Sequence, residues 1–419
     1  WWLVAARAFQ GFGGGIALPL GTALLFRAFP EEEQGLALGM LGVALVTAPA
    51  LGPILGGWLV DQGLWHWIFF INVPIAAVGL TLASRFLVEW KRGHRGPVDL
   101  PGLVTEVIGF GAVLYGASIA ADRGWTAPAV VLAFGVGLTG LVWFAFVELF
   151  VSADPLLDLR LYRKRIFLVA SLVGYVSVIA LFGAEFLLPV YLQSLRGYTA
   201  LQTGFILLPL AVTAGITLPV AGRLYDRIGP RVLLAIGFSV LAVNTWQLSL
   251  LEADTTIRWI AFLLVLRGFA LGMTVQTTFV TALSVVPLVE IARGSSLTNA
   301  TRQVVQSIGV AVLATILAST LSPEVRAMSA RIQGAEGVTT GPVAICDPEA
   351  VAAVASPLGG PDVAARAARA CQESVGGFER AYRVTFYFAL LALNIGVTLP
   401  GWPLAWGGRR SADRPPMVE

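Results

Sequence analysis

The chain has few charged residues, few histidines and few cysteines, and each shortage excludes a class of protein. Charged side chains make up 13% of its 419 residues, against about 25% in a typical soluble domain. The two histidines, His66 and His94, are isolated from each other, and no Gly-rich phosphate loop occurs. We therefore expect neither an enzyme nor an ATP-driven protein, with no cofactor and no bound metal.

Hydrophobic residues, by contrast, make up 57% of the chain, and the mean hydropathy is +0.79. They form eleven apolar segments, each near the ~20 residues that a helix needs to cross a hydrocarbon core of about 30 Å. The segments are 1–25, 36–60, 67–87, 102–121, 129–150, 167–192, 203–220, 232–250, 257–280, 297–321 and 382–406. The sequence predicts an all-α polytopic membrane protein.

The net charge of +3 does not indicate a nucleic-acid partner, because the basic residues lie in short loops between apolar segments. Alternate loops contain sixteen Lys and Arg residues, and the intervening short loops contain only three, Arg123, Arg196 and Arg258. Under the positive-inside rule the richer set is cytoplasmic. We expect the C-terminus in the cytoplasm, and because Arg greatly outnumbers Lys, a GC-rich bacterial source and a bacterial plasma (inner) membrane.

The two cysteines, Cys346 and Cys371, lie in one long polar segment, 322–379, which this topology places outside the cell. An oxidising exterior permits a disulfide, so we hypothesise one between them; the alternative is two unpaired thiols. Thiol labelling of intact cells before and after reduction decides between them. The last part of the segment, 361–379, predicts a short amphipathic helix within an external loop.

An arginine followed by closely spaced glycines occurs twice, in segments 7–13 and 267–272. Such repetition suggests an internal duplication of helical bundles, as transporter folds often have. The pair of apolar segments in 102–150 has no counterpart and is interpreted as an insertion. The predicted division is therefore 1–90 for an N-terminal bundle with three spans, 102–150 for the extra hairpin, and 166–406 for a C-terminal bundle of six.

Ionisable side chains within a span are costly and indicate function; the two best cases are Arg7 and Glu185. Burial favours a neutral carboxyl group, so Glu185 is a candidate to bind and release a proton or to neutralise a cationic ligand. The alternative is that it pairs with an arginine to hold helices together. Arg7 stays charged and would instead poise a carboxylate facing it. For Arg267 we expect satisfaction by a backbone carbonyl, and for Arg302 snorkelling towards the membrane surface.

The segment 222–231 places one carboxylate, Asp226, among three arginines between two spans. We expect Asp226 to pair with a cation and with the N-terminus of the following helix, as a clamp that must break when helices move. The alternative is a tight turn with cytoplasmic arginines. The candidate residues of this gating loop are Gly222, Asp226, Arg227, Gly229 and Arg231.

Segment 36–60 is unusually rich in helix breakers: Gly39, Gly52, Pro53, Gly56 and Gly57. In a membrane, small residues let neighbouring helices approach closely, and bundle partners satisfy the backbone groups that a proline frees. This pattern predicts a tight helix–helix contact.

These segments resemble a known family. Segment 222–231 resembles the loop signature of the major facilitator superfamily, Gly39 with 52–57 resembles its antiporter signature, and 7–11 resembles the fourth-helix motif before it. Segments 67–74, 188–193 and 299–303 are similar to parts of the fourteen-spanner drug:proton antiporters, the EmrB/QacA-like branch.

The resemblance implies fourteen spans, of which the eleven segments here would be the fourth to the fourteenth. It also implies that Arg7 works in proton coupling, that the Gly-Pro helix seals against its neighbour, and that Asp226 with Arg227 latches one conformation. We expect a secondary multidrug exporter that exchanges protons for amphipathic, often cationic, drug-like compounds. The alternatives are a uniporter or symporter of a small metabolite, and a non-transporting membrane scaffold or receptor.

Overall fold

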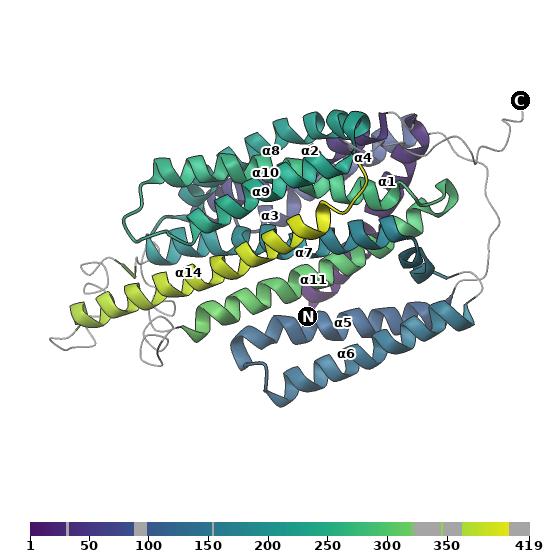
Figure 1. The fold of residues 1–419 in the computed structure, drawn as a ribbon. Helices are drawn as coiled ribbons and strands as arrows, with labels where there is room; N and C mark the ends of the chain where they lie inside the picture. The colour runs from purple at the N-terminus through teal and green to yellow at the C-terminus, as the bar shows by residue number, and fades with distance from the viewer. Residues whose placement is uncertain are drawn as a thin grey trace, which may run out of the picture.

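The computed structural model describes residues 1–30, 33–87, 99–152, 155–320, 322, 345–346 and 363–401, and within them every regular element is a helix (Figure 1). The α-helices are α1 (Trp2–Ala28), α2 (Gln34–Asp61), α3 (Trp67–Phe70), α4 (Asn72–Phe86), α5 (Leu100–Arg123), α6 (Pro128–Phe146), α7 (Arg165–Val190), α8 (Ala200–Ile228), α9 (Pro230–Leu248), α10 (Ile257–Leu283), α11 (Ile291–Ser319) and α14 (Val363–Gly396). Short helical turns are η2 (Val147–Val151), η3 (Leu159–Arg163), η4 (Tyr191–Leu195) and η5 (Leu288–Glu290).

The helices follow the predicted apolar segments. Among the described residues, nine helical segments are long and apolar enough to cross a membrane. Helices α2 and α14 occupy the positions of the other two predicted segments. The prediction of an all-α polytopic membrane fold is confirmed, while the division into 1–90, 102–150 and 166–406 stays a prediction.

Two segments differ in detail from the expectation. The span beginning at Trp67 is divided at Ile71 into α3 and α4, just before Pro74, which has no N–H to donate. The predicted short amphipathic helix in 361–379 is instead the first half of α14, a single helix of 34 residues. Glu379 and Arg383 form an i,i+4 ion pair there, which supports a continuous helix through the charged stretch. The predicted end of the last span, at residue 406, lies outside the described residues.

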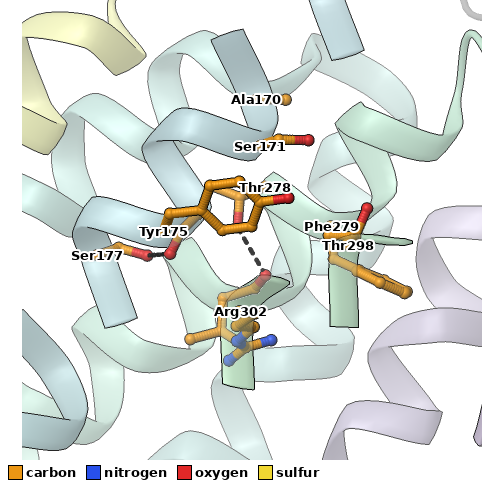
Figure 2. A pocket seen from close by; sticks show the side chains of 10 residues that line it. Ala170, Ser171, Tyr175, Ser177, Thr278, Phe279, Thr298 and Arg302 are labelled. Carbon is orange, nitrogen blue, oxygen red and sulfur yellow. Dashed lines mark hydrogen bonds between the residues drawn. The ribbon is translucent and has the colours of Figure 1, made fainter. Parts of the chain in front are cut away.

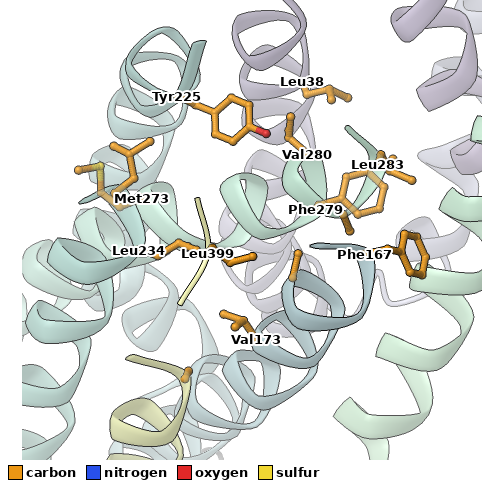
Figure 3. Packing of buried hydrophobic residues seen from close by; sticks show 14 of the residues in the cluster. Leu38, Phe167, Val173, Tyr225, Leu234, Met273, Phe279, Val280, Leu283 and Leu399 are labelled. Carbon is orange, nitrogen blue, oxygen red and sulfur yellow. The ribbon is translucent and has the colours of Figure 1, made fainter. Parts of the chain in front are cut away.

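Helices α7 to α11 and α14 form one bundle with α10 at its centre. Helix α10 packs against α7, α8 and α9, and α14 packs against α7 and α9. Buried side chains form two hydrophobic clusters centred on this bundle, and the larger one also includes residues of α1, α2 and α6. Figure 3 shows part of the larger one, with Phe167, Leu234 and Phe279. The two clusters occupy different levels along the helices, and the polar residues described below lie between them in sequence.

The hairpin of α5 and α6 packs on itself and, through α5, against α11. Glycines allow the close approach: a methyl group at Gly140 would lie 2.9 Å from the Cα of Gly109. At the turn, the indole N–H of Trp125 donates to Thr315 of α11 at 2.9 Å. In Figure 1 the hairpin lies below α11, away from α2 and α8.

Helix α8 has well-defined signals at both ends. Thr199 and Gln202 form a reciprocal capping box at its start. At its end Gly229 adopts φ = 77°, which favours glycine, and Pro230 opens α9. Asp226 lies on the last helical turn of α8, three residues before Gly229.

Candidate functional site: a glycine seam and a buried polar layer

Helices α2 and α8 lie side by side (Figure 1) and run antiparallel, and glycines on both helices bring their backbones close together. A methyl group at Gly39 would lie 2.7 Å from the carbonyl oxygen of Leu218, and one at Gly57 2.7 Å from the amide nitrogen of Leu201. From the opposite side, a methyl group at Gly204 would lie 2.9 Å from the amide nitrogen of Ile54. We call this contact the α2–α8 seam, and any side chain added there would meet backbone.

The glycines predicted as an antiporter motif divide into two groups. Gly39 and Gly57 face α8 in the seam, whereas a methyl group at Gly52 or Gly56 would meet nothing within 4 Å of the described structure. The backbone of α2 is helical through Pro53, whose side chain lies outside the described residues. Only part of the motif therefore forms the tight contact.

Asp226 joins the two helices at one end of the seam. Its carboxylate accepts hydrogen bonds from the backbone N–H groups of Gly35, at 2.9 Å, and Leu36, at 3.2 Å. These are among the first residues of α2, so the carboxylate caps the positive end of that helix dipole. The prediction that it would bind the following helix, α9, is wrong, because its partner helix lies about 190 residues earlier in the chain.

The other residues of the predicted gating loop have simpler roles. Gly222 lies so close to the carbonyl oxygen of Gly35 that a methyl group would clash with it. Gly229 forms the turn, Arg227 is exposed and Arg231 is half-buried. Within the described residues neither arginine forms an ion pair with Asp226. The carboxylate is held by backbone donors.

Arg267 is the largest fully buried side chain in the described structure, with 1% of its surface exposed. Its Nη2 donates to the carbonyl oxygens of Ala180, at 2.9 Å, and Leu181, at 2.5 Å. Its Nη1 donates to Oδ1 of Asn244 at 3.3 Å, and the amide of Asn244 donates to Leu263 O at 2.7 Å. Backbone carbonyls bind Nη2 of Arg267, as predicted, whereas its Nε is buried without a hydrogen-bond partner among the described residues. The arginine thereby links α7, α9 and α10.

Glu185 lies one turn beyond Leu181 on α7 and interacts electrostatically with both Arg267 and Arg302. We call Glu185, Asn244, Arg267 and Arg302 the polar layer. In each helix this layer falls between residues of the two hydrophobic clusters: Leu181 and Leu187 flank it on α7, and Leu264 and Ala270 on α10. One carboxylate thus faces two guanidinium groups inside an otherwise apolar bundle.

Arg302 borders a small pocket of about 10 Å³ between α7, α10 and α11 (Figure 2). Ser171 and Tyr175 of α7 and Thr278 of α10 are among its other lining residues, and the hydroxyl of Tyr175 lies 2.6 Å from that of Tyr162. The volume suits about one water molecule. The prediction that Arg302 snorkels to the surface is therefore wrong, because its side chain borders this internal pocket and interacts electrostatically with Glu185.

Arg7, the other predicted coupling residue, lies on α1 and does not belong to the polar layer. It is exposed on α1, donates to Oε1 of Gln10 at 2.8 Å, and lies over the ring of Phe69 with 4.8 Å to its centroid. Among the described residues no carboxylate pairs with it. The structure does not bring Arg7 and Glu185 together.

The sulfur atoms of Cys346 and Cys371 are 2.04 Å apart and form a disulfide. The backbone N–H of Cys346 donates to Leu195 O at 3.3 Å, which ties the short described piece of the long polar segment to the end of α7 and η4. The bond joins that piece to α14.

Sequence reasoning missed two residues that the structure makes important. Asn244 is a polar residue within an apolar span, and that signal was available. Gly35 leaves room for Asp226 at the start of α2. The residues around Gly35 do not indicate this role, because Asp226 is distant in the chain.

These features define a polytopic helical membrane protein with a close-packed glycine seam and an internal charged layer. The family model of the Major Facilitator Superfamily matches residues 1–310, and the chain belongs to that superfamily. Its members are transporters rather than enzymes, as the sequence predicts.

Individual relatives agree with this assignment. The chain is 34% identical over 314 residues to the uncharacterized MFS-type transporter YhcA of Bacillus subtilis, covering 75% of this chain and 59% of YhcA. It is 32% identical to the multidrug export protein EmrB of Escherichia coli, covering 75% of this chain and 62% of EmrB. It is 29% identical to the lincomycin resistance protein LmrB of Bacillus subtilis, covering 76% and 66%. The chain thus spans about three fifths to two thirds of the length of these relatives.

Proposed function

We propose that the full-length protein is a proton-driven multidrug exporter of a bacterial plasma membrane that works by alternating access. Its cargo would be amphipathic, often cationic, drug-like compounds. Two relatives are named for multidrug export and lincomycin resistance, which supports a drug-like substrate. The observation that supports proton coupling is the polar layer, in which Glu185 is, among the described residues, the one carboxylate that interacts with both Arg267 and Arg302.

The protonation state of Glu185 sets the charge balance of the polar layer. An ionised Glu185 offsets one of the two guanidinium charges, and a protonated Glu185 leaves both uncompensated in a medium of low dielectric constant. Protonation therefore changes the net charge of the layer from one positive to two. Because α7, α9, α10 and α11 all contribute to it, such a change favours a rearrangement of these helices.

The α2–α8 seam supplies the second requirement, a contact that can open. Where glycine meets backbone, as at Gly39 and Gly57, few side chains have to withdraw, and the carboxylate of Asp226 accepts hydrogen bonds from two N–H groups. We propose that this end of the seam is cytoplasmic and that the bonds of Asp226 latch one of the alternating conformations. On the same topology the C-terminus is cytoplasmic and the disulfide is outside.

Efflux from proteoliposomes tests the proposal. The full-length protein should export a fluorescent cation when an inward proton gradient is imposed, and Glu185→Gln should reduce gradient-driven efflux at least tenfold. Glu252→Gln, at an exposed glutamate between α9 and α10, is the matched control and should keep the wild-type rate. Flux that ignores the gradient would support a uniporter, and no flux of any solute would support a scaffold.

A further inference from the structure

Three carboxylates gather at the end of the α5–α6 hairpin opposite its turn. Asp99 caps α5, with Oδ1 accepting a hydrogen bond from Gly102 N at 2.8 Å. Glu148 lies in η2, directly after α6, and Glu106 lies one turn beyond Gly102 on α5. We call Asp99 and Glu148 the hairpin base; neither belongs to the polar layer or the α2–α8 seam.

The hairpin base contains buried oxygen atoms that lack partners. Glu148 is fully buried, and its Oε2 has no hydrogen-bond partner. Its Oε1 accepts a long bond of 3.5 Å from Leu157 N, and the backbone of Leu156 also interacts with this carboxyl group. The Oδ2 of Asp99 is likewise buried without a partner. A buried, unpaired carboxylate oxygen is expensive, so both atoms require a donor.

Both carboxyl groups lie beside the Cα of Gly102. A methyl group at Gly102 would lie 2.7 Å from Oδ2 of Asp99 and 3.0 Å from Oε1 of Glu148. Both oxygens therefore border the same small space. Any side chain at position 102 would fill it.

The charges around Glu148 make two ionised carboxylates unfavourable. Its electrostatic neighbours among the described residues are Asp99 and Glu106, both acidic. In the segment that follows, Asp158 accepts a bond from Arg160 N, and the guanidinium of Arg160 stays exposed and donates to Leu149 O at 3.4 Å. Arg293 and Arg302 of α11, the helix packed on α5, are not among the charged neighbours of Glu148.

The donor that fits is a proton. Two close carboxylates whose charged neighbours within the described residues are acidic cannot both ionise at low cost, whereas one protonated carboxyl can donate to the other. A metal ion fits less well, since within the described residues no group of three or more acidic, histidine or cysteine side chains has the geometry to hold one. We propose that Asp99 and Glu148 share one proton, taken up from water, and so form a proton-binding site in the hairpin that is separate from Glu185.

The shared proton has a structural consequence. The resulting O–H···O bond joins the start of α5 to the end of α6, opposite the turn that Trp125 anchors on α11. Loss of the proton leaves two adjacent negative charges among acidic neighbours. The hairpin base would then separate, so its packing should weaken as the pH rises.

Infrared spectroscopy of the full-length protein in deuterated buffer at neutral pH tests the site without any transport assay. The wild-type spectrum should contain a protonated-carboxyl C=O band that Glu148→Gln removes and the exposed control Glu252→Gln retains. If Glu148→Gln does not fold, Asp99→Asn, which keeps the helix cap, should shift or remove the same band. A Glu148→Gln spectrum that loses only ionised-carboxylate bands would overturn the proposal, whether the pair is bare or holds a metal cation.

Thermal unfolding gives an independent readout. The melting temperature of the wild type should fall as the pH rises above neutral, and that of Glu148→Gln should fall less, because its amide donates to Asp99 at every pH. Equal pH dependence of both proteins would overturn the proposal. Since neither measurement involves substrate or Glu185, failure here is distinct from failure of the transport proposal.

Discussion

The α2–α8 seam and the polar layer join helices by opposite kinds of contact. In the seam the helices touch through glycine and backbone, and a single carboxylate binds two N–H groups at one end. In the polar layer, long charged side chains reach across four helices and are enclosed by two hydrophobic clusters. The seam is sensitive to side-chain volume, and the layer is sensitive to charge.

This difference assigns different work to the two regions. A surface built mainly from glycine and backbone contacts can separate and close again with few changes of side-chain rotamer. A buried charge cannot move or change without a compensating change nearby. We infer that the seam permits motion between helices and that the layer decides when the motion occurs.

The largest effect is expected from removing the central charge of the layer. Arg267→Met should destabilise the protein by about 3–5 kcal/mol, because the carbonyls of Ala180 and Leu181 lose their donor and Glu185 loses a counter-charge. Thermal unfolding in detergent measures this loss, with the exposed Arg258→Met on the same helix as control.

The double variant Arg267→Met with Glu185→Gln separates charge from packing. If charge dominates the layer, the double variant should recover part of the lost stability. No recovery would mean that the arginine acts mainly through its bonds to backbone, and the contrast with the seam would weaken.

The seam should respond to volume. Alanine normally stabilises a helix interior relative to glycine by roughly 0.5–1 kcal/mol, but the methyl group of Gly39→Ala would lie 2.7 Å from Leu218 O. Overpacking of this kind costs about 1–3 kcal/mol, so the melting temperature should fall.

Gly52→Ala is the matched control on the same helix, because its methyl group meets nothing within 4 Å. It should leave stability unchanged or slightly increased. Equal damage from both substitutions would show that a second surface of α2 is closely packed in the full-length protein, and that the seam is not its single tight face.

The sequence predicted the helices well, because hydropathy and length decide which segments cross a membrane. It also located the breakers of α2 and the turn at Gly229–Pro230, whose local conformation depends on the residue type. The hydrogen bonds of Arg267 to backbone carbonyl oxygens were predictable, because a buried charge needs hydrogen-bond partners. These predictions needed no knowledge of which helices touch.

Predictions that depended on the partner were less successful. The sequence pairs Asp226 with the next helix, but it caps α2, and it places Arg302 at the surface, but Arg302 borders an internal pocket. In both cases the side chain meets a helix distant in the chain, and helical periodicity cannot specify that neighbour. The same limit explains why Gly35 escaped notice and why only two glycines of the predicted motif face the seam.

The smallest effect is expected at the latch of the seam. Asp226→Asn keeps the shape and an acceptor but removes the charge that the N-terminus of α2 favours, a loss of about 0.5–1 kcal/mol. The population with this end of the seam closed should therefore fall roughly two- to fivefold relative to the open one. Spin labels at Glu33→Cys and Arg223→Cys, two exposed positions beside the latch, would report this change as a shift in the distribution of distances between the labels. The native cysteines would not take up label, because they are bonded to each other.

Arg227→Gln is the control, because Arg227 is exposed and does not pair with Asp226. An equal shift from that variant would assign the effect to the charge of the loop as a whole, whereas a shift from Asp226→Asn alone assigns it to the carboxylate on the end of α2.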